Sequence, residues 1–278
     1  MSRVNLFVIG VNKAGTSWLY HLLNQHPAVF MSEVKELYFF DDHDRGPADI
    51  SDYHEHFPFE ADYRYFGDAT PMYYRTPSAA DAIYRYNPDA KLLAIVRDPI
   101  QRLLSQYRYH KQIGLLDEST SVSTALDGRD PMLLQDSHYE RTLPAFVDRF
   151  GHDRVKIVSL ESAKDTPREM WQELLNYLNV PAAPYPSLND RPENPTGSFL
   201  FRLVYRTTIV PTKRYAPGLY QRMLRSPAVR TAKRILLSIL GTADEETIPN
   251  EVHDRLRQEF APTYRYLDEL GFDHYPSP

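Results

Sequence analysis

The sequence predicts an α/β fold: a P-loop-like parallel β-sheet flanked by helices on both faces, with additional helices at the C-terminal end. Short apolar runs alternate with segments of helical periodicity, and this alternation is typical of βαβ units that build a parallel sheet. A glycine-containing turn at residues 10–17 joins the first apolar run to the first helical segment. The 278 residues fit one large domain, so we expect a single domain over residues 1–278.

Four apolar runs supply the strands of the predicted sheet. Residues 4–9, 92–96 and 155–160 give the clearest signals, and residues 65–67 give a weaker one. Their length is typical of buried strands. The N-terminal run is too short for a signal peptide and lacks a small-residue cleavage site, so we interpret it as the first strand.

Helical periodicity follows these strands. Leucines recur at helical spacing in residues 16–25, and Pro27 ends that pattern. After the second clear strand, Asp98 is the expected N-cap and Pro99 the first helical residue, because the missing N–H of proline would be unpaired there anyway. This helix is predicted to reach about His110. The other predicted helices cover residues 139–150, 167–178, 219–240 and 251–270.

Two segments late in the chain have a distinctive composition. Residues 181–195 contain five prolines, which predicts an extended loop within the single domain. Residues 219–240 form a basic amphipathic pattern. Such a helix can contact a membrane surface or a partner, or it can be a solvated helix with one apolar face, which is the simpler interpretation.

Composition excludes several classes of function. The 32 Lys and Arg against 37 Asp and Glu give a net charge of −5, which offers no overall field to attract nucleic acid. The absence of cysteine excludes disulfides, thiolate metal sites and a cysteine nucleophile. Histidine spacing fits no zinc site, so we expect no metal. No segment reaches the ~20 apolar residues of a membrane span, and we expect a soluble, cytoplasmic protein. The sequence indicates no oligomeric state.

The turn at residues 10–17 reads Gly-Val-Asn-Lys-Ala-Gly-Thr-Ser and resembles a phosphate-binding P-loop. Glycine lets the backbone turn closely around an anion, and the N-terminus of the following helix adds a partial positive charge. A standard ATP-binding loop has lysine directly after its second glycine. Here Thr16 occupies that position, and the lysine of the loop is Lys13. The alternative is a tight corner without a ligand, but a corner needs neither the lysine nor the Thr16-Ser17 pair.

A second element begins at the carboxyl end of the strand at residues 92–96. Arg97 stands where open α/β sheets bind ligands, and its planar guanidinium suits a phosphate. Ser105 lies under two turns into the following helix, so both side chains could reach one phosphate. Alternatively, Arg97 forms a surface ion pair with Asp98 or a nearby carboxylate.

Together the two elements are much more specific than either one. Gly-x-x-Lys-x-Gly-Thr-Ser-Trp-Leu, followed by Arg-Asp-Pro-x-x-Arg-x-x-Ser-x-Tyr, resembles the sulfotransferases that use 3′-phosphoadenosine 5′-phosphosulfate (PAPS). The resemblance is closest to bacterial members and to heparan-sulfate-type sulfotransferase domains, since Lys-Glu-Leu-Tyr-Phe-Phe-Asp at residues 35–41 also resembles a segment of those enzymes. It runs in detail from Val4 to about Leu160.

The resemblance implies roles for particular residues. Lys13, Ala14, Gly15, Thr16 and Ser17 would hold the 5′-phosphosulfate of the donor, and a second group, Arg97 and Ser105, would hold its 3′-phosphate. Lys13 would also stabilise the negative charge that grows on the leaving group during in-line transfer. No metal is required by the motif.

The general base for the acceptor is implied to be Glu36, which occupies the position of the base in the heparan-type enzymes. Read without the resemblance, Glu36 belongs to a run of mixed charge that would be a solvated face. Tyr139 resembles a position near the nucleotide, and we include it among the predicted donor-binding residues. The basic stretch at residues 213–218 matches the family's late phosphate-closing loop too loosely for an assignment.

Two departures bear on the acceptor. The heparan enzymes commonly have histidine where Tyr38 stands and lysine where Ala69 stands. Without this histidine and lysine, a highly sulfated polyanion is disfavoured as the acceptor. We therefore expect a simpler carbohydrate, a lipid headgroup or a small-molecule alcohol or amine as acceptor.

Two other functions remain open from the sequence. A P-loop kinase of a small molecule is supported by the glycine loop and by an apolar strand ending in Asp98, although the displaced Lys13 disfavours it. A nucleotide-binding module without catalysis could use the basic helix to engage a partner. The presence of Glu36 as a plausible base disfavours the module.

Overall fold

A computed structural model of the chain describes residues 3–41, 49–128, 131–186, 207, 211–212, 248–272 and 275. These residues group into two compact units. The first comprises Met1–Arg102, Asp136–Asp190 and Glu259–Pro278, and the second comprises Leu103–Gln135 and Arg191–Gln258. The predicted single domain over residues 1–278 stays a prediction.

The first unit contains a sheet of five parallel strands in the order β2-β3-β1-β4-β5. All four predicted strands are confirmed, with small shifts at their ends. Sequence reasoning missed β2, whose three residues are too few to carry a pattern. The strands are β1 (Leu6–Gly10), β2 (Val29–Met31), β3 (Tyr65–Ala69), β4 (Lys91–Val96) and β5 (Val155–Ser159).

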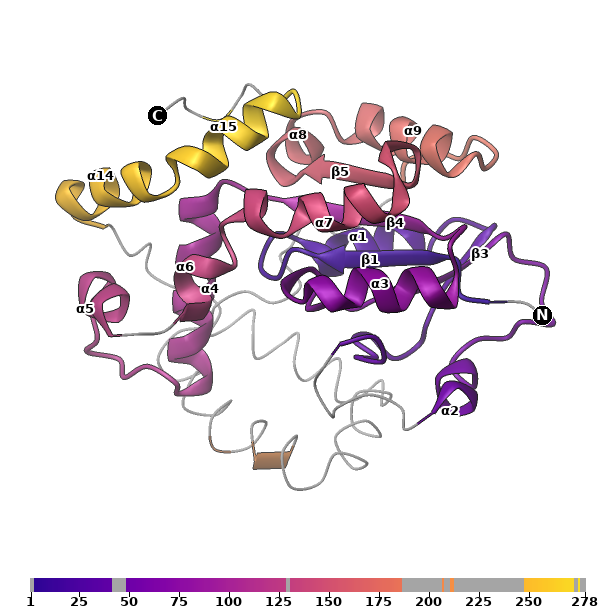
Figure 1. Ribbon diagram of the computed structural model, residues 1–278, viewed down its shortest axis with the longest axis horizontal. Coiled ribbons are helices and arrows are strands. Elements are labelled where there is room, and N and C mark those ends of the chain that lie inside the picture. The colour runs from indigo at the N-terminus through magenta and orange to yellow at the C-terminus, as the bar shows by residue number, and fades with distance from the viewer. Residues whose placement is uncertain are drawn as a thin grey trace. The chain divides into compact units, whose positions relative to one another are not determined.

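Helices cover both faces of this sheet, as the sequence predicted. In Figure 1, α3 and α7 lie over one face of β1 and β4, and α1 lies over the other. The helices of the first unit are α1 (Thr16–Leu23), α2 (Ile50–His54), α3 (Pro77–Tyr86), α7 (Leu143–Phe150), α8 (Leu160–Asp165), α9 (Pro167–Leu178) and α15 (Ala261–Glu269). Short 3₁₀ helices lie at η1 (Tyr73–Arg75), η2 (Tyr139–Arg141) and η3 (His152–Arg154).

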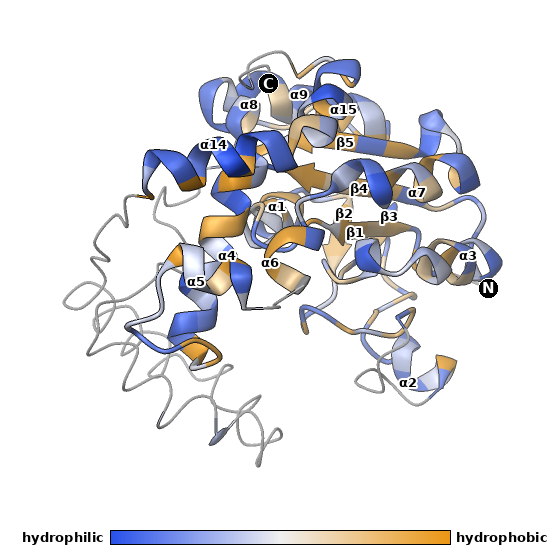
Figure 2. Cartoon of the chain, turned by 60° about the vertical axis from the view of Figure 1, so that its left-hand side comes forward, coloured by the Kyte–Doolittle hydropathy of each residue, from blue (hydrophilic) through white to orange (hydrophobic). Residues whose placement is uncertain are grey.

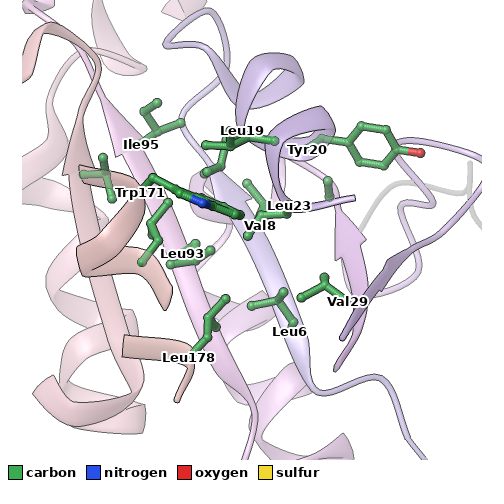
Figure 3. Close-up of a cluster of buried hydrophobic side chains, with 14 of the residues drawn as sticks. Leu6, Val8, Leu19, Tyr20, Leu23, Val29, Leu93, Ile95, Trp171 and Leu178 are labelled. Carbon is green, nitrogen blue, oxygen red and sulfur yellow. The ribbon is translucent and has the colours of Figure 1, made fainter. Parts of the chain in front are cut away.

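The strands owe their position to their apolar side chains. Figure 3 shows Leu6 and Val8 of β1 pointing into the same cluster as Leu93 of β4, with Leu19 of α1 and Trp171 of α9 closing it. These side chains are almost fully buried, so the cluster contributes the hydrophobic free energy that holds α1 and α9 on the sheet. In Figure 2 β4 and β5 are mostly coloured hydrophobic, whereas α3 mixes both colours.

On the opposite face of the sheet, β1 makes aromatic contacts. Phe7 points away from the cluster of Leu6 and Val8, and its ring packs edge to face against those of Phe40 and Tyr86 at centroid distances of 5.6 and 6.5 Å. Tyr86 belongs to α3, so this contact attaches that helix to β1.

Helix α4 (Pro99–Ile113) starts in the first unit and continues into the second. The described part of the second unit also includes α5 (Val122–Asp127), α6 (Pro131–Gln135) and most of α14 (Asn250–Glu259). Within it, the Tyr107 hydroxyl donates to the carbonyl oxygen of Thr120 at 2.5 Å, and Arg255 pairs with Asp127 at 2.9 Å.

Two predicted helices are each divided in the structure, and proline is the reason. The helix expected at residues 139–150 is a 3₁₀ turn followed by α7, with a break at Thr142. The helix expected at residues 251–270 becomes α14 and α15, with a break at Phe260. Pro144 and Pro262 occupy the first turns of the second helices, where a missing N–H is tolerated; inside one continuous helix they would lose a hydrogen bond and clash with the preceding turn.

The other helix predictions have different outcomes. The helix at residues 167–178 is confirmed as α9, and those predicted for residues 16–25 and 99–110 are α1 and α4. The loop predicted at residues 181–195 is confirmed over residues 181–186, which carry no helix or strand. Its remainder lies outside the described residues, as do the basic stretch at residues 213–218 and the helix predicted at residues 219–240. Along the part of the chain that the structure describes, no helix is long and apolar enough to cross a membrane.

Candidate functional site

The glycine loop connects β1 to α1 at the carboxyl edge of the sheet. The N–H of Val11 donates to the carbonyl oxygen of Ile95 at 2.9 Å, which attaches the loop to β4, and the N–H of Ala14 donates to Val11 at 3.1 Å. Helix α1 then begins at Thr16. The first N–H groups of any α-helix lack partners within the helix and carry a partial positive charge, so this loop presents an anion-binding end.

Close packing explains both glycines of the loop. Gly15 has φ +104°, and a Cβ there would lie 2.9 Å from Cδ1 of Leu160. A Cβ on Gly10 would lie 2.8 Å from Cδ1 of Tyr74. Lys13 is not glycine, yet its φ of 70° lies in the left-handed region. A residue with a side chain keeps this conformation only where its surroundings impose it.

The predicted loop residues differ in how they can act on a ligand. The side chain of Ala14 is fully buried and that of Thr16 nearly so, whereas Lys13 and Ser17 are half-buried. Ala14 and Gly15 can therefore contribute through the backbone, and Lys13 and Ser17 through side chains as well.

Arg97 follows β4 directly, beside the loop. The Nε atom of its guanidinium lies 4.0 Å from Oε1 of Glu161 and is buried without a hydrogen-bond partner among the described residues. Glu161 itself is held in place by the N–H of Asp98 at 3.3 Å and by the hydroxyl of Tyr275 at 2.6 Å. Arg97 therefore forms the ion pair with a nearby carboxylate that the sequence left open. Its buried Nε makes no hydrogen bond among the described residues and can still donate to an anion, which fits a phosphate at Arg97.

Tyr139 touches the backbone of the same residue. Its side chain is fully buried, and its hydroxyl donates to the carbonyl oxygen of Arg97 at 2.8 Å. Burial raises the pKa of this hydroxyl, so it stays protonated and remains a donor at neutral pH. The structure therefore brings Tyr139 to Arg97.

Arg102, the second arginine of the motif, has a structural role. Its side chain is fully buried; Nε donates to the Ser137 hydroxyl at 2.7 Å and Nη1 to the Asp136 carboxylate at 3.3 Å. The Ser137 hydroxyl donates in turn to the carbonyl oxygen of Pro99 at 2.9 Å. These bonds fix the segment that precedes Tyr139 against the start of α4.

The start of α4 is capped as predicted. Oδ1 of Asp98 accepts the N–H of Gln101 at 2.8 Å, and Oδ2 accepts the hydroxyl of Tyr264 at 2.9 Å. Burial raises the pKa of the Asp98 carboxyl. Ser105 lies further along α4, half-buried, in the second unit. The structure thus brings the loop and Arg97 together in the first unit, and the part of Ser105 in binding the 3′-phosphate stays a prediction.

Glu36 lies on the other side of the glycine loop, in the segment that follows β2. The N–H of Glu36 donates to the carbonyl oxygen of Ala69 at 3.1 Å, which attaches the segment to the end of β3. Oε1 of its carboxylate accepts from Nζ of Lys35 at 3.0 Å, and Oε2 accepts from the Tyr38 hydroxyl at 2.5 Å. The Glu36 side chain is 34% exposed, so the carboxylate can still reach a ligand.

Asp68 is a further titratable residue in this region, and sequence reasoning gave it no role. It is fully buried in β3, and burial raises the pKa of its carboxyl from 3.8 to about 6, against the opposing effect of three hydroxyl groups. An acidic residue inside a buried strand was the available signal.

The strand order places the glycine loop between the Glu36 segment and Arg97. Because β1 lies between β3 and β4, the glycine loop has the Glu36 segment on one side and Arg97 on the other. The parallel register sets Val8 opposite Ala69 and Gly10 opposite Ala94, so the three segments leave the sheet at the same edge. This edge, at the strand where the connections change direction, is where open α/β sheets bind ligands.

Comparison with known proteins identifies the family of the chain. The family described as "Sulfotransferase domain" matches residues 3–194. Heparan sulfate glucosamine 3-O-sulfotransferase 5 of Mus musculus is 37% identical over 188 residues, covering 63% of this chain and 53% of that protein. Membrane-associated sulfotransferase kil1 of Dictyostelium discoideum is 32% identical over 109 residues, covering 39% of this chain and 23% of that protein. The chain thus spans about half or less of the length of these two relatives.

Solved structures show the same fold. A sulfotransferase from Alicyclobacillus acidocaldarius has a TM-score of 0.59 at 23% identity, covering 83% of this chain and 100% of that one. The sulfotransferase domain from the curacin biosynthetic pathway has a TM-score of 0.50 at 16% identity, covering 69% of this chain and 81% of that one. Since the family match extends over more than half of the sequence, the chain belongs to the sulfotransferase domain family, an enzyme family that uses PAPS as sulfonate donor.

Proposed function

We propose that this chain transfers the sulfonate group of PAPS to a hydroxyl or amine of a small-molecule, lipid or carbohydrate acceptor. The observation that carries the proposal is the order of three segments along the carboxyl edge of the sheet. The glycine loop is central, with the Glu36 carboxylate on the β3 side and the Arg97 guanidinium on the β4 side. An anion-binding centre between a base and a second cation suits group transfer from a nucleotide.

In this proposal the donor lies across the loop. The loop from Lys13 to Ser17 binds the 5′-phosphosulfate, and Arg97 with Ser105 binds the 3′-phosphate. The buried Nε of Arg97, which has no hydrogen-bond partner among the described residues, supports this assignment. Tyr139 is fully buried, so we propose that it acts on the donor through the Arg97 backbone.

The chemistry divides between Lys13 and Glu36. As the acceptor oxygen or nitrogen bonds to sulfur, the bond between sulfur and the bridging phosphate oxygen breaks. The Lys13 ammonium stabilises the charge on that oxygen, and 3′-phosphoadenosine 5′-phosphate leaves. Glu36 takes the acceptor's proton. Its two oxygens are oriented by hydrogen bonds from Lys35 and Tyr38.

The neighbours of Glu36 bear on the choice of acceptor. Tyr38, in place of the histidine common in heparan enzymes, bonds directly to the Glu36 carboxylate. Ala69, in place of their lysine, accepts the Glu36 N–H through its backbone and adds no cation. A highly sulfated chain gains less attraction at such a site, so we propose a simpler sugar, a lipid headgroup or a small alcohol or amine.

Calorimetry tests the nucleotide. Titration with 3′-phosphoadenosine 5′-phosphate is expected to give micromolar binding that is unchanged by magnesium or by chelator. A P-loop kinase would instead bind ATP, and only with magnesium. ATP binding that requires magnesium, with no binding of the bisphosphate nucleotide, would overturn the proposal.

A labelled donor tests the acceptor. PAPS carrying ³⁵S is incubated with four acceptor sets: alkyl glycosides, lipid vesicles with glycerol or sugar headgroups, small alcohols and amines, and heparan sulfate. Transfer to one of the first three sets, above transfer to heparan sulfate, supports the proposed class. Preferential labelling of heparan sulfate contradicts it while leaving sulfonate transfer intact.

A further inference from the structure

We propose that Asp68 is a positioning residue of the transfer site: through the hydroxyls of Thr70 and Tyr73 it holds the segment that carries Glu36. The inference rests on the proposed function, because it takes Glu36 as the base. It assigns a task to a buried carboxylate that does not itself reach the acceptor.

The carboxylate of Asp68 accepts three hydroxyl hydrogens. Oδ1 accepts from Thr70 at 2.8 Å, and Oδ2 accepts from Tyr73 at 2.8 Å and from Tyr53 at 3.1 Å. Asp68, Thr70, Tyr53 and Tyr73 are all fully buried. Buried polar groups are costly unless they are paired, so this set is a built network.

Two of these hydroxyls also bind the Glu36 segment. The N–H of Tyr38 donates to Oγ1 of Thr70 at 3.4 Å, and the N–H of Phe39 donates to the Tyr73 hydroxyl oxygen at 3.1 Å. With the bond from the Glu36 N–H to Ala69, the segment is therefore attached to the end of β3 and to the residues that follow it at three points.

The ionised carboxylate sets the direction of every bond in this network. A hydroxyl has one hydrogen, and a carboxylate only accepts. The hydrogens of Thr70 and Tyr73 therefore point at Asp68, which leaves their oxygen lone pairs for the N–H groups of Tyr38 and Phe39. A protonated acid or an amide would donate to one of these hydroxyls and turn that hydroxyl's hydrogen toward an N–H.

The segment needs such support because its backbone is unfavourable. Glu36 has φ 68° and Tyr38 has φ 57°, both left-handed values for residues with side chains. Such conformations persist where the surroundings determine them, and they cluster at functional sites. Holding Tyr38 in this conformation also keeps its hydroxyl on the Glu36 carboxylate. Asp68 thus acts on the base through the backbone of residues 36–39.

The structure supplies a matched pair of variants. Tyr73 and Tyr53 are both buried, and both hydroxyls donate to Oδ2 of Asp68. In the described part of the chain, Tyr73 also accepts the Phe39 N–H, and Tyr53 has no such bond to the segment. Tyr73→Phe should therefore disturb the Glu36 segment, whereas Tyr53→Phe should cost stability alone.

The experiment compares Asp68→Asn, Tyr73→Phe and Tyr53→Phe in the full chain. For Asp68→Asn and Tyr73→Phe we expect kcat to fall by about 10-fold or more. Hydrogen exchange at the Phe39 amide should accelerate by a similar factor, because a buried hydrogen bond is lost. The affinity for 3′-phosphoadenosine 5′-phosphate should stay unchanged. Tyr53→Phe should keep both kcat and Phe39 exchange near the wild-type values. Equal effects of the two tyrosine variants, or unchanged exchange at Phe39, would overturn the inference.

A double-mutant cycle with Glu36→Gln separates this inference from the proposed function. Turnover is measured as release of 3′-phosphoadenosine 5′-phosphate from PAPS, with the best acceptor of the screen or with water. If Glu36→Gln keeps full turnover, the base assignment fails. If Glu36→Gln is slow and Asp68→Asn lowers kcat equally in both backgrounds, the base assignment stands and the inference fails. The inference expects the Asp68→Asn effect to disappear in the Glu36→Gln background. If Asp68→Asn does not fold, the comparison of Tyr73→Phe with Tyr53→Phe tests the inference in its place.

Discussion

The hydroxyl of Tyr139 donates a hydrogen bond of 2.8 Å to the carbonyl oxygen of Arg97, at the point where β4 ends. Tyr139→Phe removes the donor and leaves the arginine backbone less fixed. We expect a loss of about 1–2 kcal/mol in the free energy of unfolding, and about 5-fold weaker binding of 3′-phosphoadenosine 5′-phosphate. Calorimetry and urea denaturation measure the two effects.

Tyr177→Phe is the matched control for that variant. Its hydroxyl donates to the carbonyl oxygen of Arg154 at 2.6 Å and lies 3.1 Å from that of Leu92, at the opposite end of the same strand. It should lose comparable stability with unchanged nucleotide affinity. If Tyr139→Phe also binds the nucleotide as tightly as the wild type, Tyr139 has no part in donor binding.

Lys13 and Ser105 are expected to affect different kinetic constants. Lys13→Ala should lower kcat by about 10²- to 10³-fold, because its ammonium stabilises charge that develops in the transition state. Ser105→Ala should mainly weaken nucleotide binding, by about 5- to 10-fold, since it removes one hydrogen bond to the bound 3′-phosphate. Steady-state kinetics with ³⁵S-labelled donor separates them, and similar losses in kcat for both variants would contradict this division of roles.

Gly15→Ala combines two costs that the structure allows to be separated. A Cβ at Gly15 meets Leu160 at 2.9 Å with φ +104°, whereas Gly271 has φ +84° and open space around the added atom. Gly271→Ala should cost about 1 kcal/mol from backbone strain, and Gly15→Ala should cost up to about 1 kcal/mol more, because the end of the Leu160 side chain must shift. Denaturant titration measures the difference. Equal losses would show that the contact with Leu160 carries no weight.

The stability of the protein should depend on pH through Asp68. Burial raises the pKa of its carboxyl from 3.8 to about 6, opposed by the hydroxyls of Tyr73, Thr70 and Tyr53 and by the charge of Lys35. Between these two pH values the native state binds more protons than the unfolded chain, so the free energy of unfolding falls as pH rises, by about 3 kcal/mol in total.

Asp68→Asn removes this titration and supplies the reference. Burial also raises the pKa values of Tyr53 and Tyr73 well above their ordinary range, so neither titrates between pH 4 and 6. Urea denaturation of both proteins at several pH values should show the wild type losing stability relative to Asp68→Asn as pH rises. A constant difference, or one that grows in favour of the wild type, would contradict the raised pKa.

Local sequence patterns predicted much of this fold because they report local physics. The buried strands β1, β4 and β5 read as apolar runs, and α9 follows its periodicity from Pro167 to Leu178. Asp98 caps α4 as its position before Pro99 implied. The breaks at Thr142 and Phe260 were equally local, since a proline follows each one, but helical periodicity alone obscured them.

In the candidate site, too, the sequence predicted the local features and missed those that depend on tertiary packing. The glycine loop and its displaced Lys13 were readable from the sequence because a loop that joins a strand to a helix is a contiguous motif. The hydroxyl network of Asp68 was not, since Tyr53, Asp68 and Tyr73 come from different elements and meet only through packing. Periodicity carries no information about such partners.

The glycine loop, the displaced lysine and the strands of an α/β sheet were therefore determined by the sequence by itself, because each depends on residues close together along the chain. Only the tertiary structure decided that β1 lies between β3 and β4. That order places the Glu36 segment and Arg97 on opposite sides of the loop, and it follows from burying both faces of the sheet under helices distant in sequence.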